Sequence, residues 1–194
     1  MDETIPVLAV IILTITSTLL VLNINWRTGI IALGIQYLAA FYLFTLIFPL
    51  SFAAIKLVVG WMSVSILGSI TPPEEQIQIT SINRAGWLFR LMASAMAIVL
   101  AFSMGPNVIL FVPTGLVIVW GGLILVIMGV LHLGMTTQPA NVIQGLLTVI
   151  CGFDILYTSV ESSTLVVGLL AVTTLGLALS GSYLITSEQE EEVG

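Results

Sequence analysis

Two ionisable residues lie deep inside apolar stretches of this 194-residue sequence. Lys56 is the only charged residue between Leu50 and Ile70, and Asp154 is the only one in the stretch 139–158. If a helix begins near Pro49, Lys56 lies roughly 10 Å along it. A charged side chain deep in a bilayer costs at least about 2.5 kcal/mol on insertion scales, so it needs a partner, water or a change of protonation. The chemistry that these residues predict is therefore ion pairing or proton transfer.

Three interpretations of Lys56 and Asp154 are open at this point. In the first, the two side chains face each other and form a structural ion pair, in which each lowers the desolvation cost of the other. In the second, Lys56 gains and loses a proton as a neighbouring charge approaches or leaves, and both residues belong to a proton or cation path. In the third, Lys56 extends its ammonium group to the membrane surface.

Other polar residues are secondary candidates. Gln36 is expected at mid-membrane depth, where its amide needs a hydrogen bond to another helix. Glu161 is predicted to be a solvated loop acid. His132 is the only histidine, which excludes haem ligation by two histidines within this chain, and it is interpreted as an interfacial residue facing headgroups or a neighbouring helix. The single Cys151 forms no internal disulfide and predicts no metal site.

No catalytic centre and no cofactor are expected in this chain. It has no phosphate-binding loop, no dinucleotide fingerprint and no paired-cysteine motif. Whether the chain belongs to an enzyme as a subunit stays open.

The elements that hold these residues are predicted to be membrane-spanning helices. The sequence is 58% hydrophobic and 7% charged, whereas soluble domains are about 25% charged. This composition predicts an all-α integral membrane protein with one polytopic domain over 1–194. Its N-terminal helices, with Lys56, fall in 1–104 and its C-terminal helices in 108–186, followed by an acidic tail at 187–194. Seven segments have the length that a spanning helix requires: 5–23, 28–48, 50–70, 85–104, 108–133, 139–158 and 163–186.

The connections are predicted from turn compositions. Thr71-Pro-Pro-Glu-Glu75 opens a longer loop that ends at Arg84, and Gly105-Pro-Asn107 is expected to separate the fourth and fifth segments. Small residues recur at helix-packing spacings and predict close contacts between helices: Gly121, Gly122 and Gly129 in one segment, and Gly168 and Gly176 in another.

Charge predicts orientation and excludes one class of partner. The formal net charge is −6, and six of the ten acidic residues lie in the two ends of the chain. This distribution argues against nucleic-acid binding, which needs a basic face. The acidic start does not fit a signal peptide. Arg27, Arg84 and Arg90 fall on one side of seven spans, so the positive-inside rule predicts an external N-terminus and a cytoplasmic C-terminus.

The sequence resembles hydrogenase-4 component E. The resemblance rests on a Trp-Arg turn before IALGIQYLAAF, on SFAAIKLVVGWM in the third segment, and on the seven-segment topology. The last two segments, with 141–152 reading NVIQGLLTVICG, are similar to the K subunit of complex I and the C subunit of Mrp-type antiporters. The resemblance implies a bacterial or archaeal plasma-membrane protein beside antiporter-like subunits, in which Lys56 belongs to a proton-conducting axis.

The chain departs from the pattern of these families at the expected acids. Ile150 stands where K-like subunits carry a glutamate, and Asp154 lies about one turn further along the same helical face. Val172 stands where the final helix tends to carry an acid, and the segment before the penultimate helix, TTQPAN, has no basic residue. The resemblance therefore does not imply a complete proton channel within this chain.

The sequence favours a non-redox membrane subunit of an energy-converting complex, such as a group 4 hydrogenase or a complex I relative. It would bridge antiporter-like subunits and contact lipid, with Lys56 and Asp154 contributing to a proton or cation path. The first alternative is a structural accessory subunit of another respiratory or photosynthetic complex, with bound lipid or pigment and no ion transport. The second is a small stand-alone transporter, against which stands the lack of an internal inverted repeat.

Overall fold

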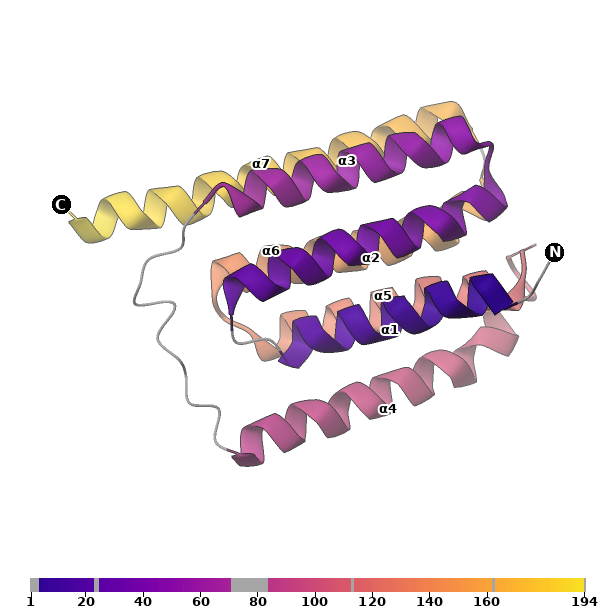
Figure 1. Ribbon diagram of the computed structural model, residues 1–194, viewed down its shortest axis with the longest axis horizontal. Coiled ribbons are helices and arrows are strands. Elements are labelled where there is room, and N and C mark those ends of the chain that lie inside the picture. Colours follow the sequence, from indigo (N-terminus) through magenta and orange to yellow (C-terminus); the bar gives the residue numbers. More distant parts are fainter. Residues whose placement is uncertain (1–3, 23–24, 71–83, 113, 162, 194) are drawn as a thin grey trace.

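The computed structural model describes residues 4–22, 25–70, 84–112, 114–161 and 163–193. These residues form seven α-helices and no strand (Figure 1). The helices are α1 (Thr4–Leu22), α2 (Trp26–Ile47), α3 (Leu50–Gly68), α4 (Arg84–Val108), α5 (Leu116–Met135), α6 (Pro139–Thr158) and α7 (Thr164–Val193).

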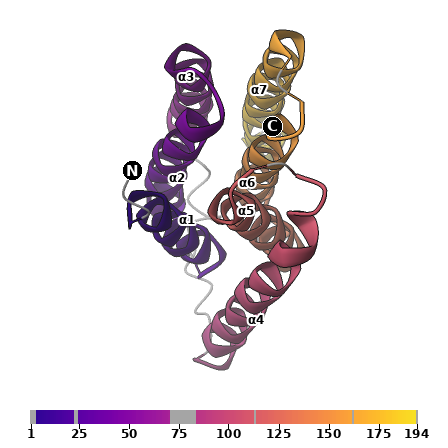
Figure 2. The same cartoon turned by 90° about the vertical axis from the view of Figure 1, so that its right-hand side faces the viewer.

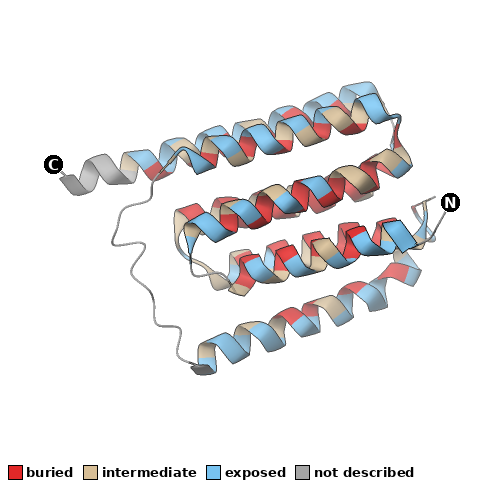
Figure 3. Cartoon of the chain, viewed as in Figure 1, coloured by how far each residue is buried: buried red, intermediate tan, exposed pale blue. Residues whose placement is uncertain are grey.

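All seven helices are long and apolar enough to cross a membrane. Their outward surfaces carry large apolar side chains, such as Met96 on α4 and Leu165 on α7, which are each 77% exposed. Exposed positions cover most of α4 and the outer faces of α3 and α7 (Figure 3). Hydrocarbon accommodates such surfaces, and a helix satisfies its backbone groups without water. The prediction of an all-α integral membrane protein is confirmed.

The helices form two rows that pack against each other. Helices α1, α2 and α3 make one row and α5, α6 and α7 the other, with α4 at the end of the second row beside α5 (Figure 2). Across the interface α1 packs on α5, α2 on α6 and α3 on α7. An even number of chain reversals separates the members of each pair, so they run in the same direction. The second row therefore repeats the order and direction of the first, without the inverted topology found in many transporters. Polar side chains in the interface between the rows are shielded from lipid.

Glycines on α5 and α6 let these two helices approach closely. A Cβ atom added at Gly152 would lie 2.7 Å from the carbonyl oxygen of Gly122, and one added at Gly129 would lie 2.8 Å from the backbone nitrogen of Val149. The expected close packing of this glycine set is confirmed. The same expectation is wrong for Gly168 and Gly176, where an added Cβ would meet nothing within 4 Å, because this face of α7 points away from the other helices.

The predicted break at Gly105-Pro-Asn107 is wrong. Helix α4 continues through Pro106 to Val108, and α5 begins only at Leu116. A proline in the last turn removes only one backbone donor, so the helix can continue past it. Gly105 also provides the space in which the Trp120 indole of α5 packs, since a Cβ there would lie 2.3 Å from the indole nitrogen. This contact holds the end of α4 against α5.

The last helix is longer than predicted. Helix α7 runs to Val193 through the acidic segment that was expected to be a separate tail, because glutamate is a good helix former. The loop predicted over 71–84 falls almost entirely outside the described residues, and α4 begins at its last residue, Arg84.

Candidate functional site

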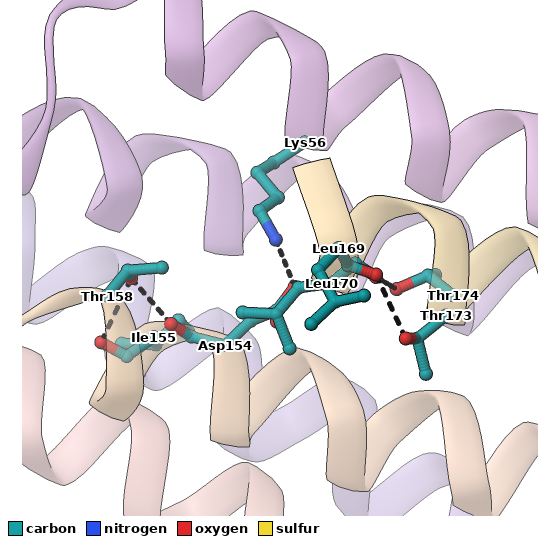
Figure 4. Close-up of polar contacts among 8 residues, drawn as sticks. All are labelled: Lys56, Asp154, Ile155, Thr158, Leu169, Leu170, Thr173 and Thr174. Atoms are coloured by element: carbon teal, nitrogen blue, oxygen red, sulfur yellow. Dashed lines mark hydrogen bonds and ion pairs between the residues drawn. The ribbon is translucent and has the colours of Figure 1, made fainter. Parts of the chain in front are cut away.

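Lys56 and Asp154 form an ion pair across the interface between the rows. The Lys56 ammonium group donates a hydrogen bond to Oδ2 of Asp154 at 2.8 Å. The side chains are only 5% and 7% exposed. Figure 4 shows Lys56 reaching from α3 to Asp154 on α6. The α7 residues drawn in the same view are Leu169, Leu170, Thr173 and Thr174. Of the three interpretations, the structure supports an ion pair, because the Lys56 ammonium group points to Asp154 and both side chains are buried.

Helix periodicity explains why these two side chains point inward. The buried positions of α3 recur every three or four residues, and Lys56 is one of them, after Ala53 and before Gly60. Asp154 lies on the broad buried face of α6, which packs on α2, α5 and α7. Lys56 is about 9 Å from the start of α3 and Asp154 about 6 Å from the end of α6, so the pair lies nearer one end of the helices than the other.

The two charges depend strongly on each other. A buried pair survives only if each charge is matched, and removal of one partner leaves an uncompensated charge at a cost of about 3–5 kcal/mol. The second carboxylate oxygen, Oδ1 of Asp154, is buried and has no hydrogen-bond partner among the described residues. The carboxylate is therefore held from one side and still able to accept a hydrogen bond from the other.

A second polar contact lies further along the same interface. Gln36 on α2 is fully buried, and its amide nitrogen donates to the Thr148 hydroxyl on α6 at 3.3 Å. That hydroxyl in turn donates to the carbonyl oxygen of Gln144. Gln36 was expected to need an interhelical hydrogen bond, and the structure provides one. Like Lys56 and Asp154, Gln36 joins one row to the other.

Two residues of this interface, Tyr37 and Thr148, were not singled out from the sequence. Tyr37 is 6% exposed, and its ring packs against α3 at Gly60, where an added Cβ would overlap the ring. Its hydroxyl has no hydrogen-bond partner among the described residues.

The signal for Thr148 was in the sequence. One face of α6 carries polar or small side chains at intervals of three or four residues, all of them buried: Gln144, Thr148, Cys151, Asp154 and Thr158.

His132 and Arg90 lie at the opposite end of the helices from the ion pair. Nε2 of His132 lies 3.1 Å from the carbonyl oxygen of Asn141 at the start of α6, and the ring is 6% exposed. His132 therefore contacts a neighbouring helix, which is one of the two placements expected for it. Arg90 donates to the carbonyl oxygens of Val21 and Met135 at the ends of α1 and α5.

The remaining candidates stand apart from the site. Glu161 is exposed between α6 and α7, as a solvated loop acid should be. Ile150 is half-buried on α6, whereas Val172 is 68% exposed on the outer face of α7. Among the described residues, no group of three or more His, Cys, Asp or Glu side chains is placed to hold a metal ion.

Comparison with protein-family models, curated proteins and solved structures gives no match. The chemistry of the chain is therefore inferred from the row interface itself. There the arrangement can bind an opposite charge, exchange a proton between an amine and a carboxylate, or lock two helices together.

Proposed function

We propose that this protein is a non-redox membrane subunit of a multisubunit energy-converting complex. In this role it bridges antiporter-like subunits, and the Lys56–Asp154 pair contributes to a proton or cation path. The observation that carries the proposal is the buried ion pair, which joins two helix rows inside otherwise apolar spans. Intramembrane charges are costly, and where they persist they mark ion pathways or proton relays by default.

The geometry of the pair suits charge transfer. A proton that arrives at Oδ1 of Asp154 neutralises the carboxylate and weakens its hold on Lys56. An approaching negative charge favours the protonated form of both groups, the Lys56 ammonium and the neutral Asp154 carboxyl. In both cases the protonation of the pair responds to a charge outside it, which is what a relay between neighbouring subunits requires.

The departures from the resembling families limit the proposal to a contribution. An acid at position 172 would face away from the row interface, because Val172 is 68% exposed. Position 150 is half-buried and carries an isoleucine. Asp154 is thus the acid that α6 offers to the interface. Neighbouring subunits would supply the remaining proton-binding groups.

The alternative is a structural accessory subunit without ion transport. The observation that favours it is the burial of both partners of the pair, which in a purely structural role would fix α3 against α6. The two functions differ in one outcome. A structural pair affects assembly or stability, and it leaves transport unchanged in any complex that still assembles.

The proposed orientation places the N-terminus outside and the C-terminus in the cytoplasm. Arg27 near the start of α2 and Arg90 near the start of α4 lie at the same end of the helices, the end that the positive-inside rule assigns to the cytoplasm. Reporter fusions at each terminus test this assignment.

Purification of the tagged protein in mild detergent, with mass spectrometry of the proteins that accompany it, tests the partner assignment. We expect antiporter-like subunits together with nickel–iron or iron–sulfur proteins. Photosynthetic or cytochrome partners would support the accessory role instead. A protein that purifies alone while remaining folded would contradict both.

A further inference from the structure

Buried polar atoms without a partner are concentrated between the two helix rows. Among the described residues, seven buried side-chain nitrogen or oxygen atoms lack a hydrogen-bond partner, and five of them belong to α2 and α6. One of the five, Nε1 of Trp26, is on a half-buried residue at the start of α2, and the other four are on buried residues. These four are Nε2 of Gln144, Oε1 of Gln36, the hydroxyl of Tyr37 and Oδ1 of Asp154. Each parent side chain is more than nine-tenths buried. An unpaired buried polar group costs about 1–3 kcal/mol, so four along one interface require an explanation.

Three of these four side chains are held by other contacts, which limits their rotation toward a partner. Gln36 is held through its amide nitrogen by Thr148. Asp154 is held through Oδ2 by Lys56. The Tyr37 ring is confined by its close approach to Gly60. The unpartnered atoms of Gln36, Asp154 and Tyr37 therefore cannot turn toward another protein partner without breaking these contacts.

The free atoms match the hydrogen-bonding capacity of water. Oε1 of Gln36 and Oδ1 of Asp154 are acceptors, Nε2 of Gln144 is a donor, and the Tyr37 hydroxyl is both. From Gln144 to Asp154 they extend for about 15 Å along α6, since these residues are ten positions apart. Water molecules that bridge buried polar groups make two to four such bonds each.

We propose that this interface binds a row of water molecules from Gln144, past Gln36 and Tyr37, to Asp154. This inference deepens the proposed function and, in its role as a proton supply for the Lys56–Asp154 pair, rests on it. The binding of water itself depends only on the four unpartnered atoms. The row would lead from the ion pair, near the end of α6, back toward the start of α6, where His132 contacts Asn141.

Cys151 provides a probe inside the row. It is the single cysteine of the chain, it is 2% exposed, and it lies on the α6 face between Thr148 and Asp154. Its S–H stretching band therefore reports one buried position in the infrared spectrum. In D₂O the band shifts only when deuterium reaches the thiol, so the rate of the shift measures access of water to the interface. Cys151→Ala identifies the band by removing it.

The measurement uses the full chain in lipid nanodiscs and needs no partner subunit. We expect the Cys151 thiol to exchange much faster than the protected backbone amides of the helix cores. Gln36→Leu and Gln144→Leu should each slow the exchange by about tenfold or more, as expected for loss of a bridging site worth about 1.4 kcal/mol. Thr16→Val is the matched control, because Thr16 is equally buried on α1 and donates only within its own helix.

Two results would overturn the inference. Exchange of the wild-type thiol as slow as that of the core amides would show a dry interface. Fast exchange that neither Gln36→Leu nor Gln144→Leu changes would show that water reaches Cys151 by another route. Both results are independent of ion transport. Conversely, a hydrated interface in an assembled complex whose transport ignores the ion pair would refute the proposed function and leave the water row standing.

Discussion

Removal of one partner of the Lys56–Asp154 pair should destabilise the protein far more than removal of both. Lys56→Met keeps the length of the side chain and removes its charge, and Asp154→Asn keeps the shape of the carboxylate. Each single change leaves a buried charge without its partner, so each should lower the free energy of unfolding by about 3–5 kcal/mol. The double variant leaves only an uncharged amide with incomplete hydrogen bonding, at about 1–3 kcal/mol.

The double-mutant cycle therefore predicts a coupling energy of at least about 3 kcal/mol between Lys56 and Asp154. Reversible unfolding in mixed detergent, followed by circular dichroism or tryptophan fluorescence, measures the four free energies. Ile55→Met serves as the control, because Ile55 is the neighbouring residue on α3 and is 45% exposed on the outer face. Its free energy of unfolding should stay within about 0.5 kcal/mol of the wild-type value.

The reasoning would be refuted if the two single changes were additive within about 0.5 kcal/mol. Additivity would mean that Lys56 and Asp154 do not interact in the folded membrane protein, despite the 2.8 Å separation of their charged atoms.

Three further changes test the packing around the site. Gly60→Ala should cost about 1–3 kcal/mol and lower the melting temperature, because the new Cβ meets the Tyr37 ring, whereas Gly176→Ala, with nothing within 4 Å, should leave it unchanged. Gly152→Ala should loosen α5 from α6 and increase proteolysis between them, since backbone atoms of α5 lie 2.7 Å from the added Cβ. Arg90→Met should lower the melting temperature by removing donors to the ends of α1 and α5, and Arg90→Lys should restore only part of the loss.

The candidate site could be predicted from the sequence where a residue conflicts with its surroundings. Lys56, Asp154 and Gln36 stand out because each is costly in an apolar span. Their partners were harder to predict, since Lys56 and Asp154 are 98 positions apart and meet only because α3 and α6 belong to facing rows. Tyr37 gave no comparable signal, whereas Thr148 belongs to the face of α6 on which polar or small residues recur every three or four positions.

The end of α4 and the start of α5 could not be predicted from the sequence, because contacts between the two helices determine them. Gly105 and Pro106 have the composition of a turn, yet packing of Trp120 on Gly105 favours one more helical turn in α4. The following residues, Pro113-Thr114-Gly115, carry an equally strong turn composition, and Gly115 is the residue at which α5 is capped. Local composition alone does not decide between two adjacent turn signals.

Proton translocation by the assembled complex tests the central claim most directly. Membrane vesicles from cells with wild-type protein or the Lys56→Met, Asp154→Asn double variant would be compared by dye quenching, at equal amounts of assembled complex. The double variant is chosen because it restores much of the stability that each single change removes. The proposed function predicts intact assembly and a clear loss of proton translocation. Unchanged translocation in a fully assembled complex would contradict it and leave Lys56 and Asp154 as a structural pair.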